Sequence, residues 1–149
     1  MNVIELRQTK ALLIPDVQAL IKRCVEQSNL LCPYGFDSIA KDIVDFVQDP
    51  MQFMFLGAEG GAFKSVMAGY LPVGNLFPYP TVVMFYNEGS RALSRATQEA
   101  CMDFINAAGY TKLLACNTSG RDDNVWQRGL TPEGATSRLV GSLALFEVE

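Results

Sequence analysis

The sequence predicts a single α/β domain over residues 1–149, in which about four helices flank a central mixed sheet of about six to seven strands. Two observations carry this prediction. Short apolar runs alternate along the chain with segments whose apolar residues recur every three or four positions. A hydrophobic content of 49% over 149 residues supplies one core, and no linker or repeat divides the chain.

The first half of the chain is expected to contain one strand, two helices and a hairpin of strands. Residues 3–7 are expected to form an outer strand, and a helix from residue 12 or 15 to residue 27 follows. We expect Asp37 to cap a second helix, which the Asp49-Pro50 pair ends. Strands at 52–56 and 63–71 are joined by a segment rich in glycine, which is typical of a hairpin.

Residues 81–117 form the most informative unit of the second half. The apolar run 81–86 is typical of a strand buried on both faces, so we expect a central strand. From Leu93 to Ala108 apolar residues recur at helical spacing, and Gly109 ends the helix before a strand at 113–116. A short helix at 124–128, ended by Gly129, and a last strand at 139–148 are expected to follow.

The long predicted helix begins with arginines, although helix starts usually carry acidic residues. Arg91 and Arg95 lie four positions apart, so their guanidinium groups share one face and repel each other unless an anion lies between them. Together with Ser90, Ser94 and free backbone N–H groups they are typical of a phosphate site. Alternatively, these arginines are solvated surface residues and Ser90 or Asn87 merely caps the helix. The local pattern leaves both interpretations open.

The composition excludes several kinds of chemistry. There is no His, which removes Ser-His and Cys-His catalysis. The four cysteines lack the paired spacing of zinc ligands, so we expect no metal site and buried thiols instead. These cysteines are Cys24, Cys32, Cys101 and Cys116.

The net charge of −4 disfavours nonspecific attraction to nucleic acid, although a local basic patch could exist around four arginines. These are Arg91, Arg95, Arg121 and Arg128. No apolar run is long enough to cross a membrane and the first residues lack the pattern of a signal peptide. We therefore expect a cytoplasmic protein without a membrane partner.

The predicted order of elements resembles that of the GNAT superfamily of N-acetyltransferases over essentially the whole chain. In that family the fourth strand splays from the fifth, and acetyl-CoA lies in the gap with its pyrophosphate on the start of the following helix. Gly109 matches the family's Gly after this helix, which places the pyrophosphate turn at residues 89–94. The resemblance implies acetyl-CoA as cosubstrate and an amine as acceptor.

The resemblance also implies a cofactor-binding set on the fourth strand, in the turn after it and at the end of the fifth strand. This set comprises Met84, Phe85, Tyr86, Gly89, Ser90, Arg91, Ala92, Leu93, Ser94, Arg95 and Asn117. The turn is degenerate, because the family pattern Gln/Arg-x-x-Gly-x-Gly/Ala becomes Gly89, Ala92 and Ser94 here. A Cβ at the last two positions narrows the approach of backbone amides to phosphate.

Candidate catalytic residues are few. The family's Tyr that protonates the leaving thiolate has no counterpart in residues 124–130, where Trp126 offers only an N–H donor. The strand 81–86 holds no carboxylate, so Glu88 at its end and Tyr86 are the candidates for acid and base work. Alternatively, Glu88 is a solvated turn residue and Tyr86 packs in the core or at its rim.

Two functions from different classes follow. The first is acetyl-CoA-dependent transfer of an acetyl group to an amine, which we prefer because the degenerate turn has gained cations. The second is a catalytically inactive GNAT-like binding or assembly protein, like members of the fold in tailed-phage particles. Its contact surface would be the loop 71–80, which carries Leu76, Phe77 and Tyr79. A different nucleotide-like anion at the same helix start is a weaker third interpretation, and a homodimer is compatible with the sequence.

Overall fold

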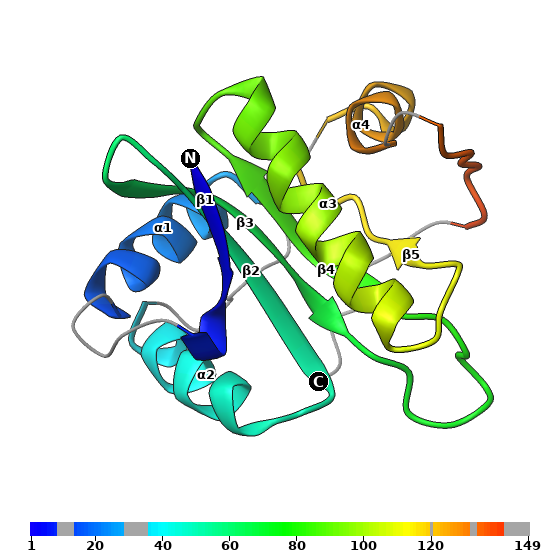
Figure 1. The fold of residues 1–149 in the computed structure, drawn as a ribbon, viewed down its shortest axis with the longest axis horizontal. Helices are drawn as coiled ribbons and strands as arrows, with labels where there is room; N and C mark the ends of the chain where they lie inside the picture. The colour runs from blue at the N-terminus through cyan, green and yellow to red at the C-terminus, as the bar shows by residue number, and fades with distance from the viewer. Residues whose placement is uncertain (9–13, 29–35, 120, 132–133, 142–149) are drawn as a thin grey trace, which may run out of the picture.

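The computed structural model describes residues 1–8, 14–28, 36–119, 121–131 and 134–141 (Figure 1). The elements in chain order are β1 (Asn2–Glu5), the 3₁₀ helix η1 (Leu6–Gln8), α1 (Ile14–Glu26), α2 (Phe36–Gln48), β2 (Gln52–Glu59), β3 (Ala62–Tyr70), β4 (Thr81–Asn87), α3 (Arg91–Ala107), β5 (Leu114–Ala115) and α4 (Asp123–Leu130). The predicted mixed α/β architecture with four α-helices is confirmed in these ranges.

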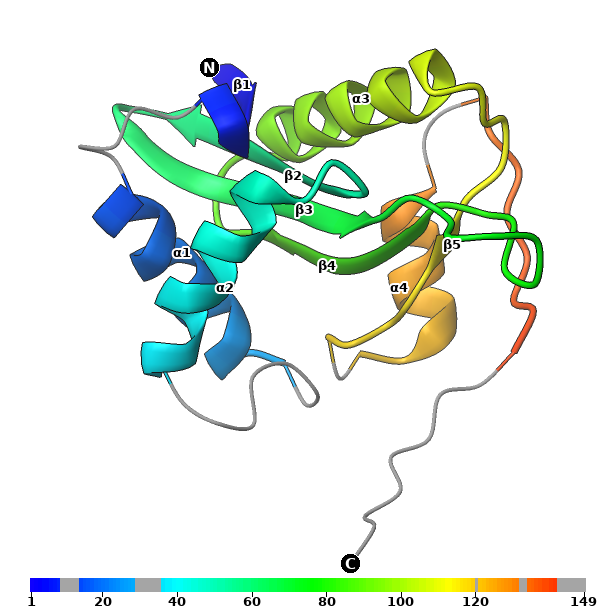
Figure 2. The ribbon, with the colours of Figure 1, turned by 90° about the horizontal axis from the view of Figure 1, so that it is seen from below.

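The strands form one mixed sheet in the order β1-β2-β3-β4-β5. The first three pairings are antiparallel, and β4 pairs with β5 in parallel through the crossover helix α3. Helix α3 covers one face of the sheet, and α1 and α2 cover the other (Figure 2). This arrangement brings the ends of β2 and β4 and the start of α3 to the same end of the sheet.

The described part of the sheet has five strands, fewer than the expected six to seven. The difference concerns the strand predicted at 139–148. Residues 139–141 are not in a strand, and the remaining residues of that segment lie outside the described ranges.

Each face of the sheet has its own apolar cluster. The predicted buried face of α1 is confirmed, since Val17, Leu20, Ile21 and Cys24 pack with residues of β2 and β3. Under α3, the ring of Phe104 lies 5.6 Å from that of Phe53 and 5.5 Å from that of Phe55, measured between centroids. These two clusters hold α1 and α3 at fixed positions on opposite faces.

Two predicted helix boundaries are wrong. Helix α2 begins at Phe36, so Asp37 lies inside its first turn instead of capping it. Helix α4 runs through Gly129 to Leu130, because the N–H of Thr131 still bonds the carbonyl of Gln127 at 3.0 Å. Gly129 does not adopt the positive φ with which a glycine typically ends a helix.

The expectation that β4 is buried on both faces is also wrong. Within β4 only Val82 is fully buried, and the other residues are partly exposed. The reason is the pairing with β5, which covers just two residues of β4. The rest of that edge has no neighbouring strand in the described ranges, so β4 is central only at its beginning.

In the described ranges, the helices are too short or too polar to cross a membrane.

Candidate functional site at the start of α3

Strands β4 and β5 part soon after they meet. Thr81 pairs with Leu114 and Val82 with Ala115, and the N–H of Cys116 donates to the carbonyl of Val82 at 2.9 Å. Further along β4 the described ranges contain no pairing with β5. Residues 83–87 therefore present one edge of backbone N–H and C=O groups that no described strand covers.

A β-bulge in β4 lies where the two strands part. Across the ladder Gly69 faces Val82 and Ala68 faces Met84, so Val83 is the extra residue. The extra residue reverses the alternation of side chains along the strand. Before it Val82 packs under α3, whereas after it Met84 packs on the α1 face.

The predicted strand residues of the cofactor set consequently point to different faces. Met84 and Tyr86 pack against the cluster beneath α1 and α2, while Phe85 packs against the cluster beneath α3. Their side chains are engaged in packing, so what this stretch offers to a ligand along its open edge is mainly backbone.

The turn between β4 and α3 is held by Ser90 and Asn87, the two residues that the sequence predicted as alternative caps of the helix. Ser90 is the N-cap of α3, and its Oγ accepts a hydrogen bond from the N–H of Leu93 at 3.1 Å. The amide of Asn87 donates to the carbonyls of Gly89 and Ser90 at 3.2 Å and accepts from the N–H of Gly89 at 3.3 Å. The helix start is therefore pre-shaped by its own residues.

Several donors gather at this helix start. The N–H groups of Arg91 and Ala92 have no partner among the described residues, as expected in a first turn. Arg91 is exposed and forms no ion pair within the described ranges, and Arg95 is exposed one turn further on. Ser94 lies beside them and is half-buried. The structure thus brings the predicted turn residues to one helix end.

Glu59, at the end of β2, reaches this helix start and was missed by sequence reasoning. The N–H of Ser90 donates to its Oε1 at 3.1 Å, and the Ser90 hydroxyl donates to its Oε2. These two hydrogen bonds hold the pKa of Glu59 below its usual value. The sequence shows Glu59 only as part of a hairpin, and its contact with α3 depends on the order of the strands.

The candidate Glu88 forms an ion pair with Arg23 of α1. Nε of Arg23 donates to both carboxylate oxygens of Glu88 at 3.0 Å, and its Nη2 lies 2.6 Å from Oε1. The Tyr86 hydroxyl donates to Oε2 at 2.9 Å. Arg23 first, and Tyr86 to a lesser degree, hold the pKa of Glu88 below its usual value. Burial, with a further contribution from Glu88, raises the pKa of Tyr86.

This cluster therefore joins a protonated phenol to an ionised carboxylate at neutral pH. A carboxylate with a lowered pKa is a weak general base, because efficient proton transfer needs a pKa near the working pH. The ion pair also ties α1 to the end of β4. Arg23 was not singled out from the sequence, since its partner lies 65 residues further along the chain.

Asn117 organises the segment between β5 and α4. Its amide donates to the carbonyl of Arg121 at 2.9 Å and to Asp123 at 2.8 Å, and its oxygen accepts from the N–H of Ser119 at 3.2 Å. Trp126 is half-buried on α4. All the polar atoms of the Asn117 side chain therefore have partners within the chain.

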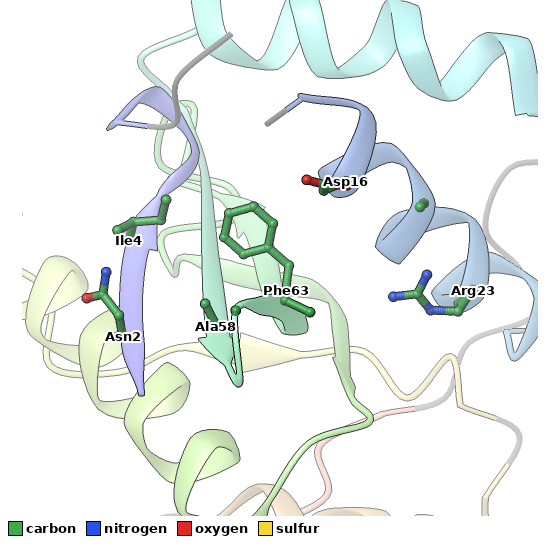
Figure 3. Close-up of a pocket in the computed structure, with 9 residues that line it drawn as sticks. Asn2, Ile4, Asp16, Arg23, Ala58 and Phe63 are labelled. Atoms are coloured by element: carbon green, nitrogen blue, oxygen red, sulfur yellow. The ribbon is translucent and has the colours of Figure 1, made fainter. Parts of the chain in front are cut away.

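A separate cavity of about 410 Å³ lies between α1, β1 and the β2–β3 hairpin (Figure 3). Its wall is mostly apolar and includes Ile4, Ala58 and Phe63, with Asp16 and Arg23 on α1. Arg23 thus borders the cavity while it binds Glu88. The cavity lies on the face of the sheet opposite α3.

Comparison with known proteins shows similarity only at the level of structure. The sequence matches no protein-family profile and no curated protein. The chain is similar to a probable acetyltransferase, with a TM-score of 0.73 and 10% identity over 100% of this chain and 99% of that chain. It is also similar to a GNAT family acetyltransferase of Staphylococcus aureus, with a TM-score of 0.63 and 11% identity over 98% and 100% of the two chains.

A third similar structure is AAC(6')-Iy in complex with the bisubstrate analogue CoA-S-monomethyl-acetylneamine. The TM-score is 0.64 at 13% identity, and the match covers 97% of this chain and 99% of that chain. The splayed strands, the crossover helix and these matches over nearly whole chains define the fold. The chain has the fold of the GNAT N-acetyltransferases.

Proposed function

We propose that the chain is an acetyl-CoA-dependent N-acetyltransferase that transfers an acetyl group to an amine. The observation that carries this proposal is the bulge at Val83, which coincides with the point where β4 leaves β5. Bulges are common next to active sites, where they re-aim a side chain or end the pairing of two strands. Here the bulge and the uncovered edge offer backbone donors and acceptors to an extended, amide-containing chain such as pantetheine.

The start of α3 supports the second part of the proposal, which is the binding of the pyrophosphate. The N–H groups of Arg91 and Ala92, the positive end of the helix dipole and the guanidinium of Arg91 are all suited to a phosphate. The fit is incomplete, because the donors of Ser90 are engaged by Glu59. A pyrophosphate would therefore gain its first contacts from Arg91, Ala92 and the neighbouring Arg95.

In the proposed reaction the nitrogen of the neutral amine attacks the thioester carbonyl, the C–S bond breaks, and the proton that the nitrogen loses neutralises the thiolate. The described residues around β4 contain no group with a pKa suited to remove the ammonium proton, since Arg23 keeps Glu88 ionised. Glu88 lies beside the proposed pyrophosphate site, five residues along the chain from the bulge, so it is not placed next to the thioester. Most of the rate enhancement would then come from holding the two reactants together.

The experiment that tests the proposal is a calorimetric titration of the protein with acetyl-CoA and with CoA. We expect saturable binding in the micromolar range and at least about tenfold weaker binding by Arg91→Glu, which replaces a phosphate donor by a like charge. Glutamate at a first-turn position suits the helix dipole, so the variant should fold. Absence of binding at millimolar ligand would refute the proposal.

Lys112→Glu is the matched control for this titration. It makes the same change of charge beyond the other end of α3, a helix of 17 residues that spans about 25 Å. Lys112 is exposed, so the control should fold. It should bind CoA like the unmodified protein. An equal loss of affinity in both variants would mean that only the overall charge matters, and not the start of α3.

A second candidate function is that of a binding or assembly module, and one observation favours it. In the loop between β3 and β4, Val73, Leu76 and Phe77 are 84%, 94% and 75% exposed. Adjacent exposed apolar side chains of this kind often mark a contact surface. Sedimentation velocity over a range of concentrations tests this function. Self-association that disappears in the Leu76→Ser, Phe77→Ser double variant would support it, and concentration-independent sedimentation would remove self-assembly as its basis.

A further inference from the structure

The carboxylate of Glu59 occupies two hydrogen-bond donors at the start of α3. Both carboxylate oxygens are used, one by the N–H of Ser90 at 3.1 Å and the other by the Ser90 hydroxyl. Within the described ranges, no other acidic side chain bonds to Ser90. The chain therefore places an anion of its own on the N-cap of the helix.

The geometry of the β2–β3 hairpin places this carboxylate next to α3. Glu59 is the last residue of β2, and Gly60 and Gly61 turn the chain with φ of 63° and 80°. Side chains alternate along a strand, so Ala58 faces the cavity beside α1 and Glu59 faces α3. The approach of Glu59 to Ser90 is thus fixed by the strand and the turn.

We infer that Glu59 is a built-in competitor of the phosphate groups that the start of α3 binds. The inference rests on the proposed function, because it concerns the same helix end. In this arrangement the carboxylate holds Ser90 in the ligand-free protein. It must leave before a phosphate oxygen can accept hydrogen bonds from the Ser90 N–H and hydroxyl.

The release of Glu59 requires little rearrangement. Its side chain lies at the surface, where the charges that face it are those of Lys64 and of the N-terminal ammonium. After release, the Oγ of Ser90 still accepts the N–H of Leu93, so the helix keeps its cap. The contact therefore tunes the affinity for a phosphate without being needed for folding.

Titration with CoA of the variants Glu59→Ala and Glu59→Gln tests this inference. We expect both variants to bind CoA about five- to tenfold more tightly, because a like charge and a competing pair of charge-assisted hydrogen bonds are gone. Pantetheine, which has no phosphate, should bind equally to the variants and to the unmodified protein. Circular dichroism should show unchanged helix content.

The control variant is Asp103→Asn, which removes one negative charge from the exposed side of α3. It lies twelve residues beyond Arg91, about 18 Å along the helix, and leaves the Ser90 contact intact. It should bind CoA like the unmodified protein. If it tightens binding as much as the Glu59 variants do, the effect is one of net charge and the inference is overturned.

The remaining outcomes separate this inference from the proposed function. Binding of CoA by the unmodified protein with no gain in the Glu59 variants overturns the inference and leaves the proposed function standing. Weaker binding by these variants also overturns it, because Glu59 would then support the site. Binding only by the variants supports both statements, and absence of binding by every variant overturns both.

Discussion

Replacement of Gly57 by Ala should shift the position of α3 on the sheet and destabilise the protein. Gly57 lies in β2 beneath the helix, and a Cβ added there would lie 2.6 Å from Oγ1 of Thr97 and 2.8 Å from Cδ1 of Leu93. Both neighbours are 0% exposed, so neither side chain can turn outward. The helix or the strand must shift to relieve the overlap.

The size of the effect follows from these distances. Ordinary contacts with a Cβ begin at about 3.4 Å, so α3 must move by roughly 0.8 Å at this point. Overpacking of a close-packed site costs about 1–3 kcal/mol, from which the gain of about 0.5–1 kcal/mol for removing a strand glycine is subtracted. The net loss is at most about 2.5 kcal/mol and centres on about 1 kcal/mol, which lowers the midpoint of thermal unfolding by about 2–4 °C in a chain of this size.

Thermal unfolding followed by circular dichroism measures this loss. The matched control is Gly129→Ala in α4, where nothing lies within 4 Å of the added Cβ and φ is not positive. The control should raise the midpoint, since Ala is favoured over Gly in a helix by up to about 1 kcal/mol. In a double variant, Thr97→Ala should recover part of the loss at Gly57 because it removes the nearest atom. A Gly57→Ala protein as stable as the unmodified one would refute the reasoning.

Two further predictions concern titratable groups. Replacement of Glu88 by Gln should lower the free energy of unfolding by about 1 kcal/mol at pH 7. Because folding lowers the pKa of Glu88, this loss should persist at every pH above the ordinary pKa of 4.5 and vanish as the pH falls through the lowered pKa. Denaturant unfolding at several pH values measures it. A loss that stays constant down to pH 2 would contradict the ion-pair explanation. Burial raises the pKa of the thiols of Cys24 and Cys101 to about 12, so in a Cys32→Ser background at pH 8 a thiol reagent should modify the half-buried Cys116 first. Equal rates at all three thiols would count against it.

Much of the fold could be predicted because its signals are local. The apolar spacing of α1 and α3 and the glycine-rich hairpin gave element boundaries within a few residues of those observed. The burial of β4 could not be predicted in the same way. It depends on how many residues of β4 pair with β5, and the residues of β4 do not indicate the length of that pairing.

In the candidate site too, contacts between residues close in the sequence could be predicted, and contacts between residues far apart in the sequence could not. Ser90 as N-cap and the arginines of the first turn follow from neighbouring residues, so the sequence could place them. The partners that define their chemistry come from elsewhere, with Glu59 31 residues and Arg23 65 residues from the atoms they bind. The bulge at Val83 was missed because it is a property of the ladder with β3 and not of the residues of β4.

Glu59 either only caps the start of α3 or also competes there with a bound phosphate. The charges around this helix start distinguish the two roles. Glu59 and Glu88 both have lowered pKa values, Glu59 chiefly through its hydrogen bonds with Ser90 and Glu88 chiefly through Arg23, with Lys64 contributing to both. Arg91 and Arg95 add two cations at the start of α3, in a chain whose net charge is −4.

Cations gathered at the start of α3 attract anions to one end of an acidic molecule. If Glu59 served only to cap α3, a helix end with fewer arginines would hold it equally well, because the N–H and hydroxyl of Ser90 already bind it. Arg91, which forms no ion pair within the described ranges, suits a second, stronger anion. The affinity for CoA should accordingly fall with ionic strength, and more steeply in the Glu59→Ala variant, where one more favourable charge contact is free to form.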